Sequence, residues 1–291
     1  MAAQRKQRKS SERKASKRKA RQQKLRKQGQ KRTPQAPSVD DQVDYALQHV
    51  EEGDMKTAKK LLSRVARKHP RHSLVFYGMG VVEAFQGNND EAIVFFNRAT
   101  EIKPDFAVAH YNAAVGHMKN YDMGNMIRSA RLAIQYGEPG DEAYENALEL
   151  IDGVERQLRK SDGISADQFL AAEDLFVKGM TAMENARWEE AIQFFRDSAA
   201  ISDNLPQPYG NMGLCYAYLG QKKQALEAFD KALERDPNYE PAIVNKASIE
   251  SLEEGKALSG KPNVMDYYKE YSNPDRSYAK DIALQHGIDI K

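Results

Sequence analysis

The sequence has 291 residues, 41% of them hydrophobic, which allows a modest core spread over one or two domains. Its one cysteine, Cys215, excludes an intramolecular disulfide and favours a cytoplasmic location. No apolar run approaches the roughly 18 residues that a membrane span needs. The N-terminus also lacks the apolar segment of a signal peptide, so we expect neither a membrane partner nor secretion.

The near-neutral net charge of +2 conceals two oppositely charged parts. Residues 1–33 hold 15 Lys and Arg against one acid, Glu12, a net of +14, which leaves −12 for the rest of the chain. Leu25 is the only large aliphatic side chain in this stretch besides Met1, too little to repay the entropy of folding. We therefore predict that residues 1–39 are a disordered basic arm and linker.

The basic side chains of the arm are candidates for contact with a polyanion. Lys and Arg release counterions when they neutralise phosphates, and no aromatic side chain stands among them to stack on bases. One hypothesis is therefore salt-sensitive, sequence-tolerant binding of RNA or the ribosome. Two alternatives stay open: a nuclear or nucleolar targeting signal, and a solubilising tail that folds back on the acidic remainder. The residues concerned are Arg5, Lys6, Arg8, Lys9, Arg13, Lys14, Lys17, Arg18, Lys19, Arg26 and Lys27.

Two sets of residues with identical internal spacing indicate a repeat. They are Gly80, Ala92, Phe96, Ala99 and Pro104, and Gly213, Ala225, Phe229, Ala232 and Pro237. A period of 34 residues with this pattern predicts stacked helix-turn-helix units. The small residues allow two helices to cross closely, the phenylalanine fills the space toward the next unit, and the proline ends the second helix.

This pattern resembles the tetratricopeptide repeat, most completely in the unit that begins at Pro206 and carries Tyr209, Met212 and Tyr216. The resemblance implies an all-α fold: a tetratricopeptide-repeat helical solenoid of antiparallel helix pairs. A third unit is expected to be distorted, because Met126 replaces a small residue.

The repeats divide the chain into segments. We expect a first block at 40–160, with about three repeats and an extra helix, and a second at 165–260, with about two and a half repeats. Residues 261–291 are expected to form a C-terminal helical cap. The two best units lie 133 residues apart, three short of four periods, so one continuous superhelix and two hinged modules both remain open.

In this family the first helix of each unit lines a concave face, so the resemblance implies a groove for a protein or peptide. In the first block that groove is expected to be apolar and to suit an amphipathic helix or an extended hydrophobic peptide. Asn211 and Asn245, one period apart, match asparagines that hold a peptide backbone in related solenoids, although Asn is also common there as a helix cap. Val43 and Leu47 replace the Lys and Asn of the cochaperone carboxylate clamp, which argues against a heat-shock-protein tail. The predicted groove residues are Leu74, Tyr77, Val81, Val108, Tyr111, Asn112, Val115, Phe176, Asn211, Leu214, Tyr218 and Asn245.

Nothing in the sequence indicates catalysis. The histidines do not converge with cysteines as zinc ligands do, and no nucleophile stands in a recognisable relation to a base. We therefore predict a noncatalytic scaffold or adaptor, without cofactor or metal, whose groove binds a protein and whose arm contacts a polyanion. The alternative is an adaptor or assembly chaperone that does not bind nucleic acid. The oligomeric state is left open.

Overall fold

The computed structural model describes residues 36–259; residues 1–35 and 260–291 lie outside that description. It separates two units, 1–38 and Val39–Lys291, and every described helix belongs to the second. The eleven basic residues of the arm and the C-terminal cap therefore remain predictions from the sequence.

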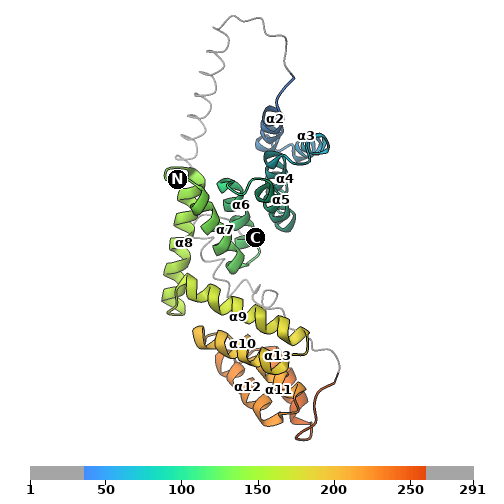
Figure 1. The fold of residues 1–291 in the computed structure, drawn as a ribbon, viewed down its shortest axis with the longest axis vertical. Coiled ribbons are helices and arrows are strands. Elements are labelled where there is room, and N and C mark those ends of the chain that lie inside the picture. Colours follow the sequence, from blue (N-terminus) through green and yellow to red (C-terminus); the bar gives the residue numbers. More distant parts are fainter. Residues whose placement is uncertain (1–35, 260–291) are drawn as a thin grey trace, which may run out of the picture. The chain divides into compact units, whose positions relative to one another are not determined.

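Residues 36–259 fold into helices without strands (Figure 1). The all-α solenoid expected from the repeat is confirmed. Its helices are α2 (Val39–Glu51), α3 (Met55–Lys68), α4 (Ser73–Phe85), α5 (Asn89–Ile102), α6 (Ala107–Lys119), α7 (Met123–Tyr136), α8 (Glu142–Ser161), α9 (Ala166–Glu184), α10 (Trp188–Ile201), α11 (Pro206–Tyr218), α12 (Lys222–Arg235) and α13 (Glu240–Glu250).

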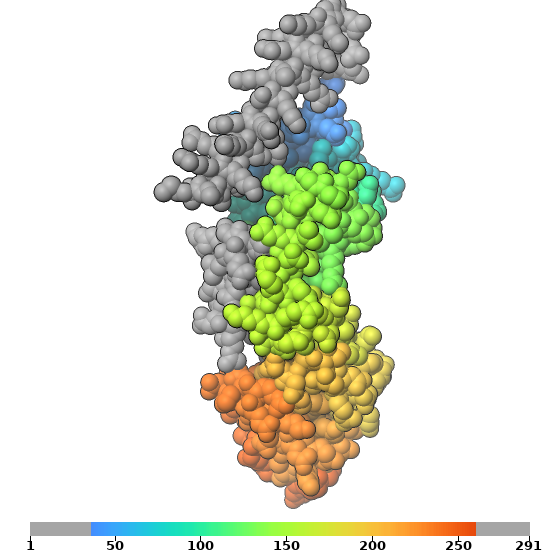
Figure 2. Space-filling model, turned by 90° about the vertical axis from the view of Figure 1, so that its left-hand side faces the viewer, coloured from blue at the N-terminus to red at the C-terminus, as the bar shows by residue number. Residues whose placement is uncertain are grey.

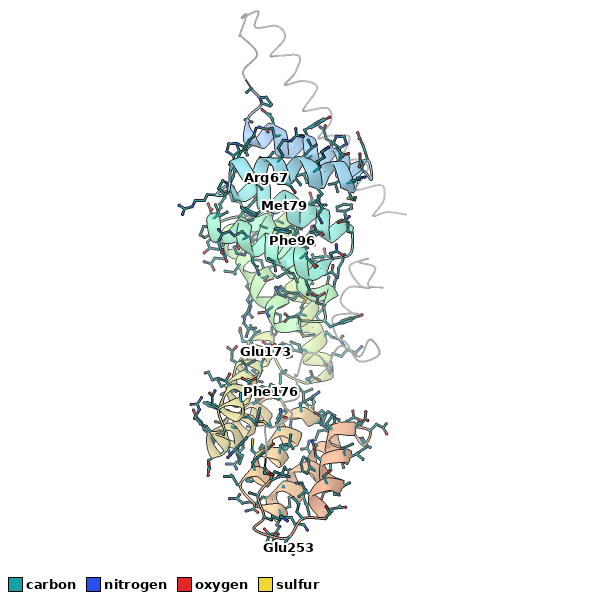
Figure 3. All side chains as sticks on the ribbon, turned by 90° about the vertical axis from the view of Figure 1, so that its right-hand side faces the viewer. Arg67, Met79, Phe96, Glu173, Phe176 and Glu253 are labelled. Carbon is teal, nitrogen blue, oxygen red and sulfur yellow. The ribbon has the colours of Figure 1, made fainter. Side chains whose placement is uncertain are left out.

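Five helix pairs form the array: each helix packs on its partner, and the second helix of each pair packs on the helix that follows it. The pairs are α2–α3, α4–α5, α6–α7, α9–α10 and α11–α12, while α13 packs on α12. The largest side chains lie inside these layers: Phe96 and Phe176 are 1% and 2% exposed (Figure 3). After α13 the chain turns back, and the backbone N–H of Leu258 donates to the carbonyl of Ala217 over 3.0 Å.

One contact recurs inside three of the pairs. A Cβ atom added to Gly80 would lie 2.6 Å from the ring of Phe96, and the same distance separates Gly213 from Phe229. Gly179 and Phe195 repeat the arrangement in α9–α10. Because Cβ contacts this short do not occur, the glycine is what allows the second helix to bring a phenylalanine against the first.

The third unit is distorted in sequence but not in packing. Ala130 stands where the second unit has Phe96, and Met126 stands where it has Ala92. Both Met126 and Ala130 are fully buried. The large and the small side chain have thus exchanged places one turn apart on α7, which keeps the core filled.

The turn inside each pair needs a left-handed residue. Gly53, Gly87 and Gly220 have φ of 83°, 81° and 72° there. Tyr121 and Ala186 take the same place with φ of 60° and 55°, the two positive values at non-glycine residues in the described part of the chain. A side chain in this conformation costs about 1–2 kcal/mol, so these two turns are strained.

Helix α9 joins the two predicted blocks. Its N-terminal half faces α7 and α8: Glu173 accepts from Nη1 of Arg128 over 2.7 Å, in a space that a Cβ on Gly124 would fill. Its C-terminal half packs on α10 through Gly179. Helix α9 therefore packs on α8 and is also the first helix of the next pair, α9–α10. The two best units lie 133 residues apart, three fewer than four periods. Figure 2 shows α8 in green next to the yellow surface of α9 and α10.

Replacing Ala186 with glycine should stabilise the protein by about 1 kcal/mol, because glycine adopts φ near 55° without steric cost. Urea unfolding followed by circular dichroism measures the change. Ala171→Gly, the same substitution at an exposed position inside α9, is the control and should destabilise by about 1 kcal/mol. If both variants lose the same stability, the turn is not strained.

Gly213→Ala should destabilise the second block by about 1–3 kcal/mol, because the added methyl group meets the ring of Phe229. The same substitution should cost much less in a Phe229→Leu background. That pairing copies the first unit, where Ala46 and Leu62 occupy these positions and are fully buried. Equal costs in the two backgrounds, measured as a double-mutant cycle, would contradict the proposed contact.

Candidate groove on the first helices

A hollow lies on the first block, between α4 and α6. Its volume is about 220 Å³, and both helices and the start of α5 form its walls. The lining is apolar apart from a few amide, hydroxyl and amine groups. It consists of Tyr77, Val81, Ala84, Phe85, Asn89, Ala92, Phe96, Asn112, Val115, Gly116 and Lys119.

Tyr77 is held in a fixed orientation at the centre of this groove. Its ring centroid lies 5.2 Å from that of Phe106 and 5.9 Å from that of Phe96. Nδ2 of Asn112 donates to its hydroxyl over 3.2 Å. Burial raises the pKa of Tyr77 against the opposing effect of this hydrogen bond, so the phenol stays neutral. The groove therefore presents a rigid aromatic wall with a polar edge.

Two features extend the groove beyond its floor. Phe85, the last residue of α4, is 66% exposed and continues the apolar surface outward. On the side of α8, burial and then the carboxylates of Glu142 and Glu149 raise the pKa of Tyr111. The lining also contains one cation, Lys119. A partner would therefore meet an apolar centre, the positive charge of Lys119 and the carboxylates of Glu142 and Glu149 on α8.

The structure brings together four of the seven groove residues predicted in the first block: Tyr77, Val81, Asn112 and Val115. The other three lie next to the groove and do not line it. Leu74 packs on the core of the first two units, Tyr111 packs on the core around α7 and α8, and Val108 is half-buried on α6. The prediction omitted Phe85, although its position in the repeat is one that lines the concave face.

The residues predicted in the second block do not form a comparable groove within the described chain. Phe176 is in the core, 5.3 Å from the ring of Phe195, and Leu214 is 7% exposed. Asn211 is 1% exposed, and its Nδ2 donates to the sulfur of Met180 over 3.3 Å. The side-chain amide that was expected to bind a peptide backbone is therefore buried and bonded to Met180.

The other two predicted residues of the second block are partly accessible. Tyr218 stacks on Trp188 at 4.4 Å with the rings nearly parallel, and Asn245 is half-buried on α13. Asn211 and Asn245 therefore differ in accessibility, because α13 has no further unit beside it in the described chain while α11 is enclosed by its neighbours.

Residues 36–259 contain no cluster of three or more potential metal ligands, and none of their helices is long and apolar enough to span a membrane. Cys215 is fully buried, and this burial raises its pKa to about 12. A thiol of that kind acts as a small core residue.

Comparisons with known proteins agree with the repeat. Models of the tetratricopeptide repeat match residues 49–117 and 206–239. Protein NPGR2 of Arabidopsis thaliana is 24% identical over 227 residues, covering 70% of this chain and 29% of that protein. The mitochondrial import receptor subunit TOM70 of Saccharomyces cerevisiae is 30% identical over 71 residues, covering 24% of this chain and 11% of TOM70. The chain thus spans less than a third of either relative.

Among solved structures, the chain is similar to YrrB, described as a TPR protein with an unusual peptide-binding site. The match covers 72% of this chain and 93% of YrrB, with 17% identity and a TM-score of 0.35. The two matched segments and the helix pairs that contain them show that the chain contains tetratricopeptide repeats.

Proposed function

We propose that this chain is a noncatalytic scaffold that binds an amphipathic helix or an extended apolar peptide in the groove between α4 and α6. The observation that carries the proposal is the groove itself, with Tyr77 fixed by Phe106 and Asn112. An aromatic ring that is already ordered loses little entropy when a partner packs on it, which favours affinity.

The lining favours a mainly apolar partner. Val81, Ala84 and Val115 offer no hydrogen bonds, so an apolar side chain can displace water there without leaving a polar group unpaired. Asn112 has a second amide proton and a carbonyl with which to bond a peptide backbone. Lys119, at the C-terminal end of α6, can pair with an acidic residue at the partner's edge.

A second contact is proposed for the basic arm. Its charge of +14 supports electrostatic binding of RNA or the ribosome, with the eleven basic residues named above making the contacts. Binding at both places would raise the overall affinity through effective concentration, provided that the two partners belong to one complex. In the alternative function, the arm is a targeting signal or a solubilising tail.

Tyr77→Ala should weaken the binding of groove peptides about tenfold or more, because it removes the aromatic wall. Peptides would be selected from a random 12-residue display library on the full-length protein and their affinities measured by fluorescence anisotropy. Tyr77→Phe keeps the ring and should have a smaller effect. Val94→Ala, at a residue of α5 that is 64% exposed and outside the groove, is the control. Peptides that bind Tyr77→Ala and the wild type equally would place the binding site elsewhere.

Replacing the eleven basic residues of the arm with glutamine in the full-length chain should abolish most RNA binding. For the wild type, the logarithm of the binding constant should fall steeply with the logarithm of salt concentration, by about 0.7 for each phosphate contacted on a single strand. Filter binding with purified RNA and ribosomes measures both slopes. If the variant keeps the wild-type affinity and slope, the arm does not bind polyanions, and the alternative function gains support.

A further inference from the structure

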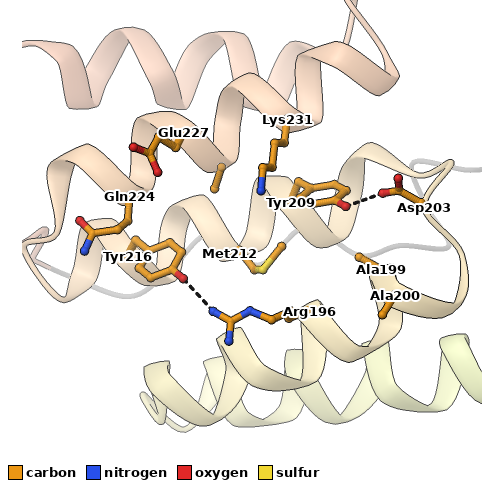
Figure 4. Close-up of a pocket in the computed structure, with 11 residues that line it drawn as sticks. Arg196, Ala199, Ala200, Asp203, Tyr209, Met212, Tyr216, Gln224, Glu227 and Lys231 are labelled. Atoms are coloured by element: carbon orange, nitrogen blue, oxygen red, sulfur yellow. Dashed lines mark hydrogen bonds between the residues drawn. The ribbon is translucent and has the colours of Figure 1, made fainter.

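A larger hollow lies in the second block, on the side formed by the second helices α10 and α12. Its volume is about 470 Å³, within the range of small-ligand pockets, and its floor is a stripe on α11 made of Tyr209, Met212 and Tyr216 (Figure 4). It shares no residue with the groove between α4 and α6. It is therefore a separate surface of the scaffold.

Small side chains create this space. Ala200 on α10 and Ala228 on α12 line the hollow. A shift of 133 positions superimposes the repeat pattern of this block on the first block. It aligns Ala200 with Arg67 of the first unit and Ala228 with Phe95 of the second unit. The second block therefore has alanine where the first block has a long side chain, and Met212 beneath the two alanines is 6% exposed.

One end of the hollow is a fixed cluster. Tyr209 donates to Asp203, whose two carboxylate oxygens accept from Nη2 of Arg235 at 2.9 and 3.0 Å. The guanidinium of Arg235 also lies 4.7 Å from the centre of the Tyr209 ring. Burial and the bond to Asp203 raise the pKa of Tyr209 to about 12, so it stays a donor. The charge of Asp203 is thus neutralised within the wall.

Two cations at the hollow have no such partner. Arg196 from α10 and Lys231 from α12 reach toward Met212 from opposite sides (Figure 4). Arg196 donates to the hydroxyl of Tyr216 over 3.1 Å and to Oε1 of Gln193 over 3.2 Å. Neither cation lies within ion-pair distance of a carboxylate in residues 36–259, although the charge of Lys231 also acts on Asp203. Glu227 is the remaining charged residue of the lining. With Asp203 bonded to Arg235, the two cations face one other carboxylate within the lining, that of Glu227.

We propose that this hollow is a second protein-binding site, which takes an acidic segment of a partner protein. A carboxylate of the segment lies between Arg196 and Lys231, and an adjacent apolar side chain packs on Ala200 and on the partly exposed rings of Tyr209 and Tyr216. Charge-assisted hydrogen bonds from Arg196 fix the carboxylate, and the alanines admit the apolar group. Glu227 on the rim selects against a second acidic residue on its side.

The test uses three fluorescein-labelled nonapeptides, Gly-Ser-Asp-X-Asp-Gly-Glu-Ser-Gly with X as Leu, Phe or Met. Their affinities for the full-length protein are measured by fluorescence anisotropy, with matched peptides that carry Asn and Gln for Asp and Glu. At least one acidic peptide should bind more tightly than about 1 mM, and its amide counterpart about tenfold more weakly.

Two variants test the location. Arg196→Gln/Lys231→Gln should weaken binding about tenfold or more by removing both cations. Ala228→Phe, which copies the side chain of the second unit, should do so by filling the hollow. Lys178→Gln/Lys223→Gln removes the same charge from exposed residues outside the lining and should leave the affinity unchanged. Circular dichroism of every variant verifies that the helices are intact.

Three results would overturn the proposal. They are no binding of any acidic peptide, equal binding of the amide peptides, and equal losses in the cation variant and its charge-matched control. Tyr77→Ala should not change these affinities. The outcome is therefore independent of whether the groove between α4 and α6 binds its own partner.

Discussion

In three of the five helix pairs, the approach of the two helices depends on one contact, in which a glycine on the first helix faces a phenylalanine on the second. Gly80, Gly179 and Gly213 each lie against a phenylalanine ring closer than a Cβ atom would allow. This contact fixes how closely the helices pack, and therefore where the first helices stand in the array. The groove between α4 and α6 depends on one such contact, because Phe96, the ring that faces Gly80, is part of its lining.

The same packing rule explains how the repeats differ. In the third pair the corresponding residues Ala114 and Ala130 are both small, and the buried Met126, one turn earlier on α7, fills the core instead. In the first pair the corresponding residues are Ala46 and Leu62, which are fully buried. At α9 the array is joined by charge as well as by packing, because Glu173 is buried and paired with Arg128. A buried carboxylate without its cation is costly, so the ion pair stabilises the packing of α9 on α7. The other half of α9 packs on α10.

The helix pairs were predictable because they follow from position in the repeat, and the same positions predicted four residues that line one hollow, Tyr77, Val81, Asn112 and Val115. That these residues bind a partner stays a prediction. For the second block, position in the repeat did not give the accessibility of the residues. Burial of Phe176 and Asn211 depends on how α9 and α11 are enclosed by neighbouring helices, which a single repeat does not reveal. The hollow over Met212 was missed for a different reason: its cause is the absence of side chains at Ala200 and Ala228, and alanines give no pattern of their own.

The most direct test of the central claim is hydrogen exchange, measured by mass spectrometry on the full-length protein with and without a selected groove peptide. We expect added protection in α4 and α6, whose residues face the groove, and little change in α3 and α7. Protection that appears instead in α10 to α12, or in none of the described helices, would contradict the claim that the first helices of the first block form the binding surface.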